Sequence, residues 1–307
     1  MKIAIVRRNG LGDLLAVMPL VALCKEKYPG CHITLFVDQR NAPLLPYLNG
    51  FDAAEIIVAS KNKYISLIKT LWKQRRKRFD WVISGRPAPM RWVNLFLTCL
   101  QARRRRAVIK SGWDAKWIDE PLHYDVAAQR HQMVKCLRLL DENIEEVPER
   151  FLPKIDVQKK YAFRGKTVLV SVTNTRVGSQ LEPEAIARHL NRMAVQVILN
   201  CEPKDLAKAQ AVGQLLIVEH QIIPTENFDD FMGLLASVDA SWTGDGGIMH
   251  LMAAMDKPQL VLFGRTPLWE WAPLSEKAIC IWHPENVNLI PEHEIEQGLK
   301  RLLNELR

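Results

Sequence analysis

The residues best suited to chemistry lie between positions 240 and 273. Residues 244–247 form a glycine-rich turn, Gly-Asp-Gly-Gly, and a helical pattern follows from Met249 to Met255. Glycines let the backbone approach a ligand closely, and a helix that begins there directs unpaired N–H groups and its positive dipole end at that ligand. A short apolar strand at 259–263 then ends in a second turn at 264–267. The spacing predicts a cradle for a phosphate or diphosphate, which the second turn can close.

A second candidate for chemistry is Asp13, in the loop after the first predicted strand. Residues 2–6 have the pattern of a buried strand, residues 8–12 form a loop, and residues 13–28 have the pattern of a helix. An aspartate here commonly caps the helix by accepting a backbone N–H. It could also act as a general base that takes a proton from an acceptor hydroxyl, and the two roles are compatible. Gly10-Leu11-Gly12 lacks the third glycine of a dinucleotide fingerprint, so the loop gives weak support to hydride transfer.

Strands alternate with helices along most of the chain, which favours mostly parallel sheets. In the first half, we predict strands at 32–37, 54–58, 81–84 and 107–109, and helices at 64–77, 92–99 and 123–140. In the second half, we predict strands at 167–172, 195–200 and 215–218, and helices at 183–193, 205–214, 228–236 and 292–306. The polar stretch 145–164 contains two prolines and no sustained periodicity, so it is the predicted linker. The sequence therefore predicts two domains, residues 1–155 and 156–307.

Composition limits the class of protein. The chain has 307 residues, enough for two domains, with 48% hydrophobic and 25% charged residues, values typical of soluble globular proteins. No apolar run is long enough to span a membrane, and the N-terminus has the pattern of a strand, unlike a secretion signal. Six scattered cysteines without a Cys-x-x-Cys pair indicate free thiols in a reducing compartment. We expect a cytoplasmic protein without a metal site.

The net charge of +8 is unevenly distributed. Residues 1–155 contain 27 Lys and Arg against 15 Asp and Glu (+12), and residues 156–307 contain 15 against 19 (−4). The excess lies at 73–78 and 103–106; a single charge run is usually a solvated face, but two in one half favour an anionic partner. Nearby Trp72, Trp81 and Trp92 would suit the surface of an anionic membrane. Nucleic acid would attract the same charge, which alone does not distinguish the two partners.

The cradle also resembles the donor-site signature of glycosyltransferase family 9, the bacterial heptosyltransferases of lipopolysaccharide core assembly. The resemblance rests on Asp245-Gly246-Gly247-Ile248-Met249-His250-Leu251, Ala253-Ala254, Pro258, Leu262-Phe263-Gly264, Thr266 and Trp271-x-Pro273. It implies an α/β protein of GT-B architecture, with two Rossmann-like domains facing across a cleft. It also implies an inverting glycosyltransferase without a metal or other cofactor. Gly12-Asp13 is similar to the family's catalytic loop, which implies that Asp13 is the base.

The resemblance further implies a donor, an acceptor and a location. The C-terminal domain would hold a nucleotide-sugar, ADP-heptose, through Arg176, Asp205, Thr243, Asp245, Gly246, Gly247, Met249, His250, Gly264 and Arg265. The N-terminal domain would hold an anionic inner-core glycolipid through Asn9, Gly10, Gly12 and Arg86, in peripheral contact with the cytoplasmic face of the inner membrane. No nucleic acid is expected. His250 could donate to phosphate or pack in its helix, and Asp205 could bind a ribose hydroxyl or, as is more usual, cap its helix.

One departure from the family keeps alternatives open. Where the family has Lys-x-Trp-Pro-x-Glu, residues 179–184 are Ser-Gln-Leu-Glu-Pro-Glu, and Arg176 is the candidate to replace the lysine's charge. A transferase for a different nucleotide-sugar is therefore an alternative. A nucleotide-sugar epimerase is another, although it would not need the basic first half. The third is a non-catalytic lipid- or nucleic-acid-binding protein on a decayed transferase fold.

Overall fold

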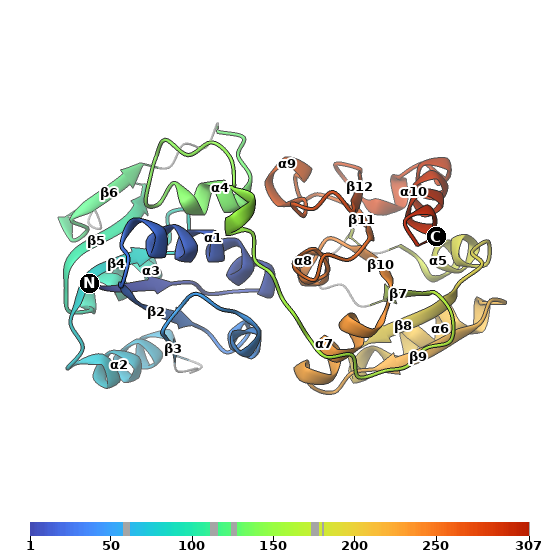
Figure 1. Ribbon diagram of the computed structural model, residues 1–307, viewed down its shortest axis with the longest axis horizontal. Coiled ribbons are helices and arrows are strands. Elements are labelled where there is room, and N and C mark those ends of the chain that lie inside the picture. The colour runs from blue at the N-terminus through green and yellow to red at the C-terminus, as the bar shows by residue number, and fades with distance from the viewer. Residues whose placement is uncertain (58–61, 111–115, 124–127, 173–177, 180, 307) are drawn as a thin grey trace. The chain divides into compact units, whose positions relative to one another are not determined.

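The computed structural model describes residues 1–57, 62–110, 116–123, 128–172, 178–179 and 181–306 (Figure 1). Its internal contacts divide the chain into two units, Met1–Pro153 and Lys154–Arg307. Their boundary is close to the one predicted after residue 155. Each unit is an α/β structure with its own six-stranded sheet.

The N-terminal unit is built on a parallel sheet with the strand order β3-β2-β1-β4-β5-β6. Its strands are β1 (Lys2–Val6), β2 (His32–Val37), β3 (Ala53–Ile56), β4 (Phe79–Ser84), β5 (Ala102–Ile109) and β6 (Glu120–His123). Its helices are α1 (Leu11–Lys27), α2 (Lys63–Gln74), α3 (Arg91–Cys99) and α4 (Gln132–Leu137). Residues 3–6 of the central strand β1 are fully buried, as the continuous apolar run of an inner parallel strand requires.

The C-terminal unit repeats this plan, with the order β12-β11-β10-β7-β8-β9 and all pairs parallel. Its strands are β7 (Thr167–Ser171), β8 (Gln196–Cys201), β9 (His220–Pro224), β10 (Ala240–Gly244), β11 (Gln259–Phe263) and β12 (Ala278–Trp282). Its helices are α5 (Pro183–Leu190), α6 (Leu206–Leu215), α7 (Phe228–Ser237), α8 (Gly247–Ala254), α9 (Leu268–Trp271) and α10 (Glu292–Asn304). The segment from residue 154 belongs to this unit: Ile155 N–H donates to the Ala254 carbonyl at 2.8 Å.

Both sheets therefore have the strand order of the doubly wound Rossmann fold. In such sheets the connections reverse direction between two central strands, and ligands bind outside the carboxyl ends of the strands at that point. The central pairs here are β1 with β4 and β7 with β10. The loop with Asp13 follows β1, and the glycine-rich turn follows β10. Both predicted sites thus occupy the place where the fold favours a ligand.

Three predicted elements differ in the structure. The helix predicted at 123–140 is shortened to α4, because His123 pairs with Ile109 in β6 and the helix begins only after His131. The strand predicted at 215–218 is wrong: α6 continues to Leu215, and the edge strand is β9. The strand predicted at 107–109 is longer and includes the arginine run 103–106.

Among the described residues, no helix is both long enough and apolar enough to cross a membrane. The helices instead cover two separate cores. The C-terminal core is centred on Val168, Val197, Leu199 and Leu260, and the N-terminal one on Ala4, Val82 and Phe96, all fully buried. Each sheet therefore stabilises its own unit, and each site is built on its own scaffold.

Candidate active site

The N-terminal site is organised by Arg7, a fully buried arginine that directly follows β1. Its Nε donates to the Asp13 carbonyl and its Nη1 to the Gly85 carbonyl, both at 2.8 Å, while Nη2 pairs with the Asp13 carboxylate. A buried guanidinium is tolerated when it is paired and hydrogen-bonded. Arg7 therefore ties the start of α1 to the segment that follows β4.

Asp13 is the third residue of α1, so it does not occupy the N-cap position, which is Gly10. Its Oδ2 accepts the Gly10 N–H at 3.1 Å, and its Oδ1 accepts from Arg7. The carboxylate therefore supports the helix start from inside the first turn, and the prediction that Asp13 is the N-cap residue is wrong. A quarter of the side chain remains exposed (25%), so the carboxylate can still meet a substrate hydroxyl.

A second carboxylate, Asp38, follows the neighbouring strand β2. It accepts the N–H groups of Asn9 and Arg40, each at 3.1 Å, and lies 3.5 Å from Arg8 Nε. Asn9 has a positive φ of 92°, and its bond to Asp38 holds this unusual backbone. Asp38 is less exposed than Asp13 (12% against 25%). It therefore shapes the loop, and Asp13 is the carboxylate better placed to act as a base.

The segment after β4 completes the N-terminal site. Val6 and Ser84 are register partners, so Arg7 and Gly85 lie at the same sheet edge. A Cβ at Gly85 would come within 2.9 Å of Val17 and 3.0 Å of the Val6 carbonyl oxygen, which explains the glycine. Arg86 follows, its N–H 3.3 Å from Ser84 Oγ. Arg86 therefore follows β4 at the same sheet edge as the loop that carries Asp13.

Cys136 lies beneath this edge, 3.8 Å from the Gly85 carbonyl oxygen. Burial raises the pKa of its thiol to about 11. A thiol with so high a pKa stays protonated and is a poor nucleophile. Cys136 therefore packs under the site and takes no part in covalent chemistry there.

The structure brings all five predicted N-terminal residues to one sheet edge: Asn9, Gly10, Gly12, Asp13 and Arg86. Sequence reasoning missed Arg7 and Asp38. Asp38 could have been found, because it directly follows the strand that pairs with β1. Arg7 could not, because an arginine after a strand gives no sign that it will be buried.

In the C-terminal unit, the glycine-rich turn begins α8 as predicted. Gly246 is its N-cap in an extended conformation, and among the described residues no side chain caps this end. Asp245 is buried (2% exposed), and its N–H donates to the Leu262 carbonyl at 3.0 Å. That bond fixes the turn to the neighbouring strand β11. The N–H groups of the first turn of α8 are therefore held in a fixed place where an anion would be stabilised.

The second turn packs against the segment that follows β7. A Cβ at Gly264 would lie 2.6 Å from the Gly178 carbonyl oxygen, so only glycine allows this approach. The Gly264 carbonyl accepts the Trp282 indole N–H at 2.8 Å, and Gly178 accepts the Val287 N–H at 2.9 Å. The two turns and the segment after β7 thus form one edge, as the sequence predicted for the two turns.

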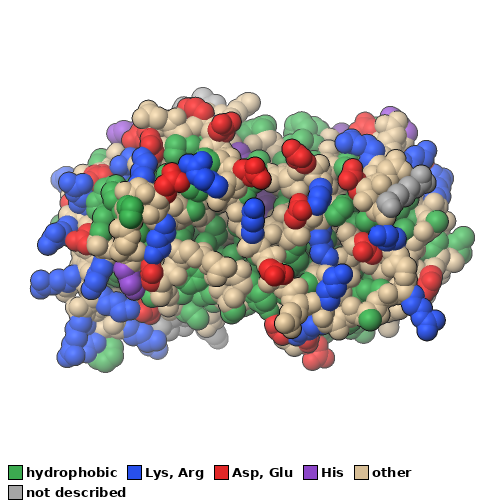
Figure 2. Space-filling model, viewed as in Figure 1, with side chains coloured by type: hydrophobic (Ala, Val, Ile, Leu, Met, Phe, Trp, Pro, Cys, Tyr) green, Lys and Arg blue, Asp and Glu red, His purple; other side chains and the backbone are tan. Residues whose placement is uncertain are grey.

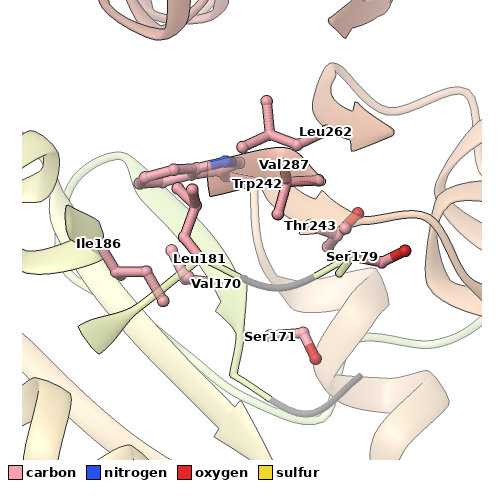
Figure 3. Close-up of a pocket in the computed structure, with 10 residues that line it drawn as sticks. Val170, Ser171, Ser179, Leu181, Ile186, Trp242, Thr243, Leu262 and Val287 are labelled. Carbon is pink, nitrogen blue, oxygen red and sulfur yellow. The ribbon is translucent and has the colours of Figure 1, made fainter. Parts of the chain in front are cut away.

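A small cavity of about 20 Å³ lies at this edge, large enough for a water molecule. Figure 3 shows Trp242, Leu181 and Ile186 on its apolar side and the hydroxyls of Ser171, Ser179 and Thr243 on the other. Thr243 Oγ1 is buried and has no hydrogen-bond partner among the described residues. Because an unpaired buried hydroxyl is costly, Thr243 is suited to a water or a ligand atom.

Other predicted donor residues lie in different surroundings. The Met249 side chain is buried with Val261 and Phe263, so only its backbone could face a phosphate. His250 is buried (7% exposed), with its ring edge-on to Trp271 at 5.9 Å, which fits the packing role left open above. Arg265 is exposed and has no ion-pair partner among the described residues. Arg265 therefore provides the second turn with an exposed positive charge.

Two more candidates contribute differently. Asp205 makes no capping hydrogen bond to any described residue, so its expected capping role is wrong; it pairs with Lys208 at 3.1 Å. The preceding residue, Lys204, pairs with Glu202 at 2.5 Å, and this hydrogen bond raises the pKa of Lys204. Arg176 lies outside the described residues. Within the described ranges, no three His, Cys, Asp or Glu side chains gather as a metal site.

Comparison with known proteins gives one consistent result. Residues 180–301 match the model of glycosyltransferase family 9 (heptosyltransferase). Lipopolysaccharide heptosyltransferase 3 of Escherichia coli (strain K12) is 24% identical over 95% of this chain and 90% of its own length. The fold is that of a family 9 glycosyl transferase from Veillonella parvula (TM-score 0.84, 14% identity, 99% of this chain and 97% of that one). It is also that of E. coli heptosyltransferase WaaC with ADP (TM-score 0.78, 14% identity, 98% and 100%).

These likenesses span both units. The structural matches show the two-domain GT-B fold, and the sequence match extends from the donor motif over nearly the whole chain. The family model covers β11, the glycine-rich turn and the second turn, where the geometry provides an anion cradle. Residues 180–301 therefore match glycosyltransferase family 9, and the chain as a whole is similar to lipopolysaccharide heptosyltransferases.

Proposed function

We propose that this protein is an inverting glycosyltransferase that moves heptose from ADP-heptose to an anionic inner-core acceptor of lipopolysaccharide or lipooligosaccharide. The observation that carries the proposal is that Asp13 and the glycine-rich turn each follow a central strand, at the ligand-binding edge of its own Rossmann-like sheet. The name of the E. coli relative and the ADP bound to the WaaC structure support the sugar and the nucleotide.

The chemistry needs one base and relief of charge on the leaving group. Asp13 would take the proton from the acceptor hydroxyl as its oxygen attacks the anomeric carbon. The bond from that carbon to the diphosphate oxygen breaks on the opposite face, which inverts the configuration and releases ADP. Because no covalent intermediate forms, one carboxylate suffices.

The C-terminal unit would stabilise the departing ADP. The start of α8 offers N–H groups and a positive dipole end, and Arg265 adds an exposed positive charge. This arrangement can offset the diphosphate charge with protein groups alone, so we propose no metal or other cofactor. Arg176 belongs to the same proposal as the replacement for the family's lysine.

The proposed acceptor is a glycolipid, so the location proposed for the enzyme is a membrane surface. We propose that the enzyme acts at the cytoplasmic face of the inner membrane and contacts it peripherally. The basic excess of the N-terminal half supports this, since a positively charged surface attracts phosphorylated glycolipid and anionic lipid alike. Asn9, Gly10, Gly12 and Arg86 would face the acceptor.

Transfer of radiolabel from ADP-heptose to a core acceptor tests the proposal. Label in the acceptor is expected, whereas free sugar or an epimer without acceptor labelling would indicate an epimerase. The donor is tested by thermal unfolding, since a ligand at 100 times its Kd adds about 2.7 kcal/mol of stability. A shift with UDP- or GDP-sugars and none with ADP-sugars would indicate a different donor.

A further inference from the structure

Helix α2 presents apolar side chains to solvent and polar ones to the core. Ile65, Ile68 and Trp72 are 44%, 64% and 65% exposed. Their spacing of three and four residues places them on one helix face. The opposite face buries the polar residues Ser66 and Thr70, which are 7% and 1% exposed, together with Leu67. A core-facing helix normally has the reverse arrangement, so this one has an apolar stripe without a partner among the described residues.

The stripe lies within a strongly basic segment. The sequence has no acidic residue between Glu55 and Asp80. Lys69, Lys73 and Arg76 are exposed and have no carboxylate partner among the described residues. Figure 2 shows Lys and Arg side chains gathered over the region where Figure 1 places α2. The surface therefore combines a central apolar stripe with a cationic surround.

The other basic run is different, although the sequence made the two look alike. In β5, Arg104 and Arg106 pair with Glu120, and Arg105 pairs with Asp119, at 3.2 to 3.5 Å. Arg103 lies 3.6 Å from Asp80. These carboxylates offset the charge of the run locally. In the first run, Lys77 pairs with Glu55 at 2.5 Å. Lys73 and Arg76 of that run, together with Lys69 of α2, have no carboxylate partner among the described residues.

The tryptophans divide in the same way. Trp81 is buried in β4, and Trp92 is stacked on Phe96 and covered by Arg8 at 4.3 Å. The expectation that all three tryptophans face an anionic surface is therefore wrong for these two. Trp72 does face outward, and Arg75 lies over its ring at 4.0 Å. An exposed tryptophan next to cations suits the interface between lipid headgroups and acyl chains.

We propose that the outer face of α2 docks on an anionic lipid bilayer, with Ile65, Ile68 and Trp72 entering the headgroup–acyl boundary. Lys69, Lys73 and Arg76 then reach the headgroup phosphates, since long basic side chains extend from an apolar surface to a polar one. This inference rests on the proposed function in one respect only: a lipid-linked acceptor would bring the protein to a membrane.

The charge pattern disfavours the other occupants of this face. A second copy would bring two segments without acidic residues into contact, and the like charges would repel. Nucleic acid would place its phosphates against exposed isoleucines, which gain nothing from them. A bilayer satisfies both the apolar stripe and its cationic surround.

The test is co-sedimentation of the full-length protein with vesicles. Binding is expected to phosphatidylglycerol vesicles, to weaken with added salt, and to be much weaker with phosphatidylcholine alone. Ile68→Ser should weaken binding about tenfold, the factor expected when one large aliphatic side chain no longer enters an apolar phase. Lys73→Glu should weaken it roughly fivefold or more, from the loss of one cation near the surface.

The chain offers matched controls for both variants. Ile217 is 86% exposed in the C-terminal unit and Lys300 is an exposed lysine in α10, so Ile217→Ser and Lys300→Glu should bind as wild type. The four replaced side chains are all exposed. The thermal unfolding of the four variants should therefore match that of the wild-type protein. A blue shift of tryptophan emission on binding that is reduced in Trp72→Phe gives a second readout.

Three outcomes would overturn the inference: equal binding by Ile68→Ser and wild type, equal binding to neutral and anionic vesicles, or a dimer in solution that Ile68→Ser dissociates. The assay contains no donor or acceptor. Failure of vesicle binding would therefore leave the transfer reaction untouched, and failure of heptose transfer would leave docking by α2 untouched.

Discussion

At the scale of single residues, the N-terminal site depends on one ion pair, between the buried Arg7 and the partly exposed Asp13. Arg7 fixes both the backbone and the carboxylate of Asp13, while the Gly10 N–H binds the second carboxylate oxygen. The predicted base is thus held by the same contacts that begin α1. A carboxylate held in this way keeps its direction during proton transfer and needs little reorganisation.

Replacing the predicted base tests its role directly. Asp13→Asn keeps the shape of the side chain but cannot take a proton, so kcat should fall about 10²- to 10⁴-fold. The KM for ADP-heptose should change little, because the donor would bind to the C-terminal unit. Steady-state kinetics with both substrates measure this, and retained activity would support a non-catalytic role for Asp13.

Arg7 acts on Asp13 by position, so its variants should affect turnover more than donor binding. Arg7→Lys keeps the charge but cannot reproduce three hydrogen bonds in fixed directions. We expect kcat to fall up to about a hundredfold, since small misplacements of a reacting group are costly. Arg7→Met should lose more activity and also lower the Tm. If both variants lost only stability, Arg7 would be structural alone.

At the scale of elements, two glycines at the edge formed by the glycine-rich turn and the second turn serve different purposes. Gly264 is required by close packing, because a Cβ would meet the Gly178 carbonyl oxygen at 2.6 Å. Gly246 is not crowded: its Cβ would meet nothing closer than 3.9 Å, and its φ of 178° suits any residue. The protein itself thus leaves space at Gly246 that a ligand could use.

This difference gives a paired prediction. Gly264→Ala should cost about 1–3 kcal/mol of stability through overpacking, and should lower the Tm without any ligand. Gly246→Ala should leave the Tm of the free protein unchanged but weaken ADP binding. Thermal unfolding with and without ADP measures both. Unchanged ADP binding in Gly246→Ala would place the phosphates elsewhere.

Lys257 gives an element-scale prediction about pH. Its Nζ donates to the Ala236 carbonyl at 2.7 Å and to the Val238 carbonyl, and burial lowers the pKa of Lys257 to about 8. In the unfolded chain a lysine titrates near 10.4. Between these values the unfolded state binds more protons, so the lysine's contribution to unfolding free energy should rise as pH rises from about 8 to about 10.4.

The comparison of wild type with Lys257→Met isolates this contribution. The difference in unfolding free energy between the two proteins, measured by urea denaturation from pH 7 to pH 10, should shift in favour of wild type as pH rises. A difference that is independent of pH would show that Lys257 titrates normally in the folded state.

At the scale of the whole molecule, two units repeat one topology but differ in charge. Each has its own core, and the segment from residue 154 packs within the C-terminal unit. We therefore expect residues 154–307 to fold alone and to bind ADP within about tenfold of the full-length affinity. Calorimetric titration of the fragment measures this. ADP binding by the full chain but not by a folded fragment would show that the donor needs the N-terminal unit.

The sequence alone determined the fold class and the candidate sites, because both are predicted from short, local stretches of residues. Alternating strands and helices predict the α/β class, and the glycine-rich turn at 244–247 and the Gly-Asp step at 12–13 indicate two candidate sites from short stretches of sequence. The departures come from long-range contacts: pairing with Ile109 makes His123 part of β6, although the sequence from 123 predicts a helix. Local propensity is overridden wherever a distant strand supplies hydrogen bonds.

Only the tertiary structure decided which charges are buried, paired or exposed. Arg7 is buried because the segment after β4 brings the Gly85 carbonyl to it from 78 residues away. The arginines of β5 are offset by carboxylates of the neighbouring strands and of the residue before β6, while Lys69 and Lys73 of α2 remain exposed, as does Trp72. Composition fixes how much charge a chain carries, but its neutralisation depends on distances between residues far apart in sequence, which exist only in the folded chain.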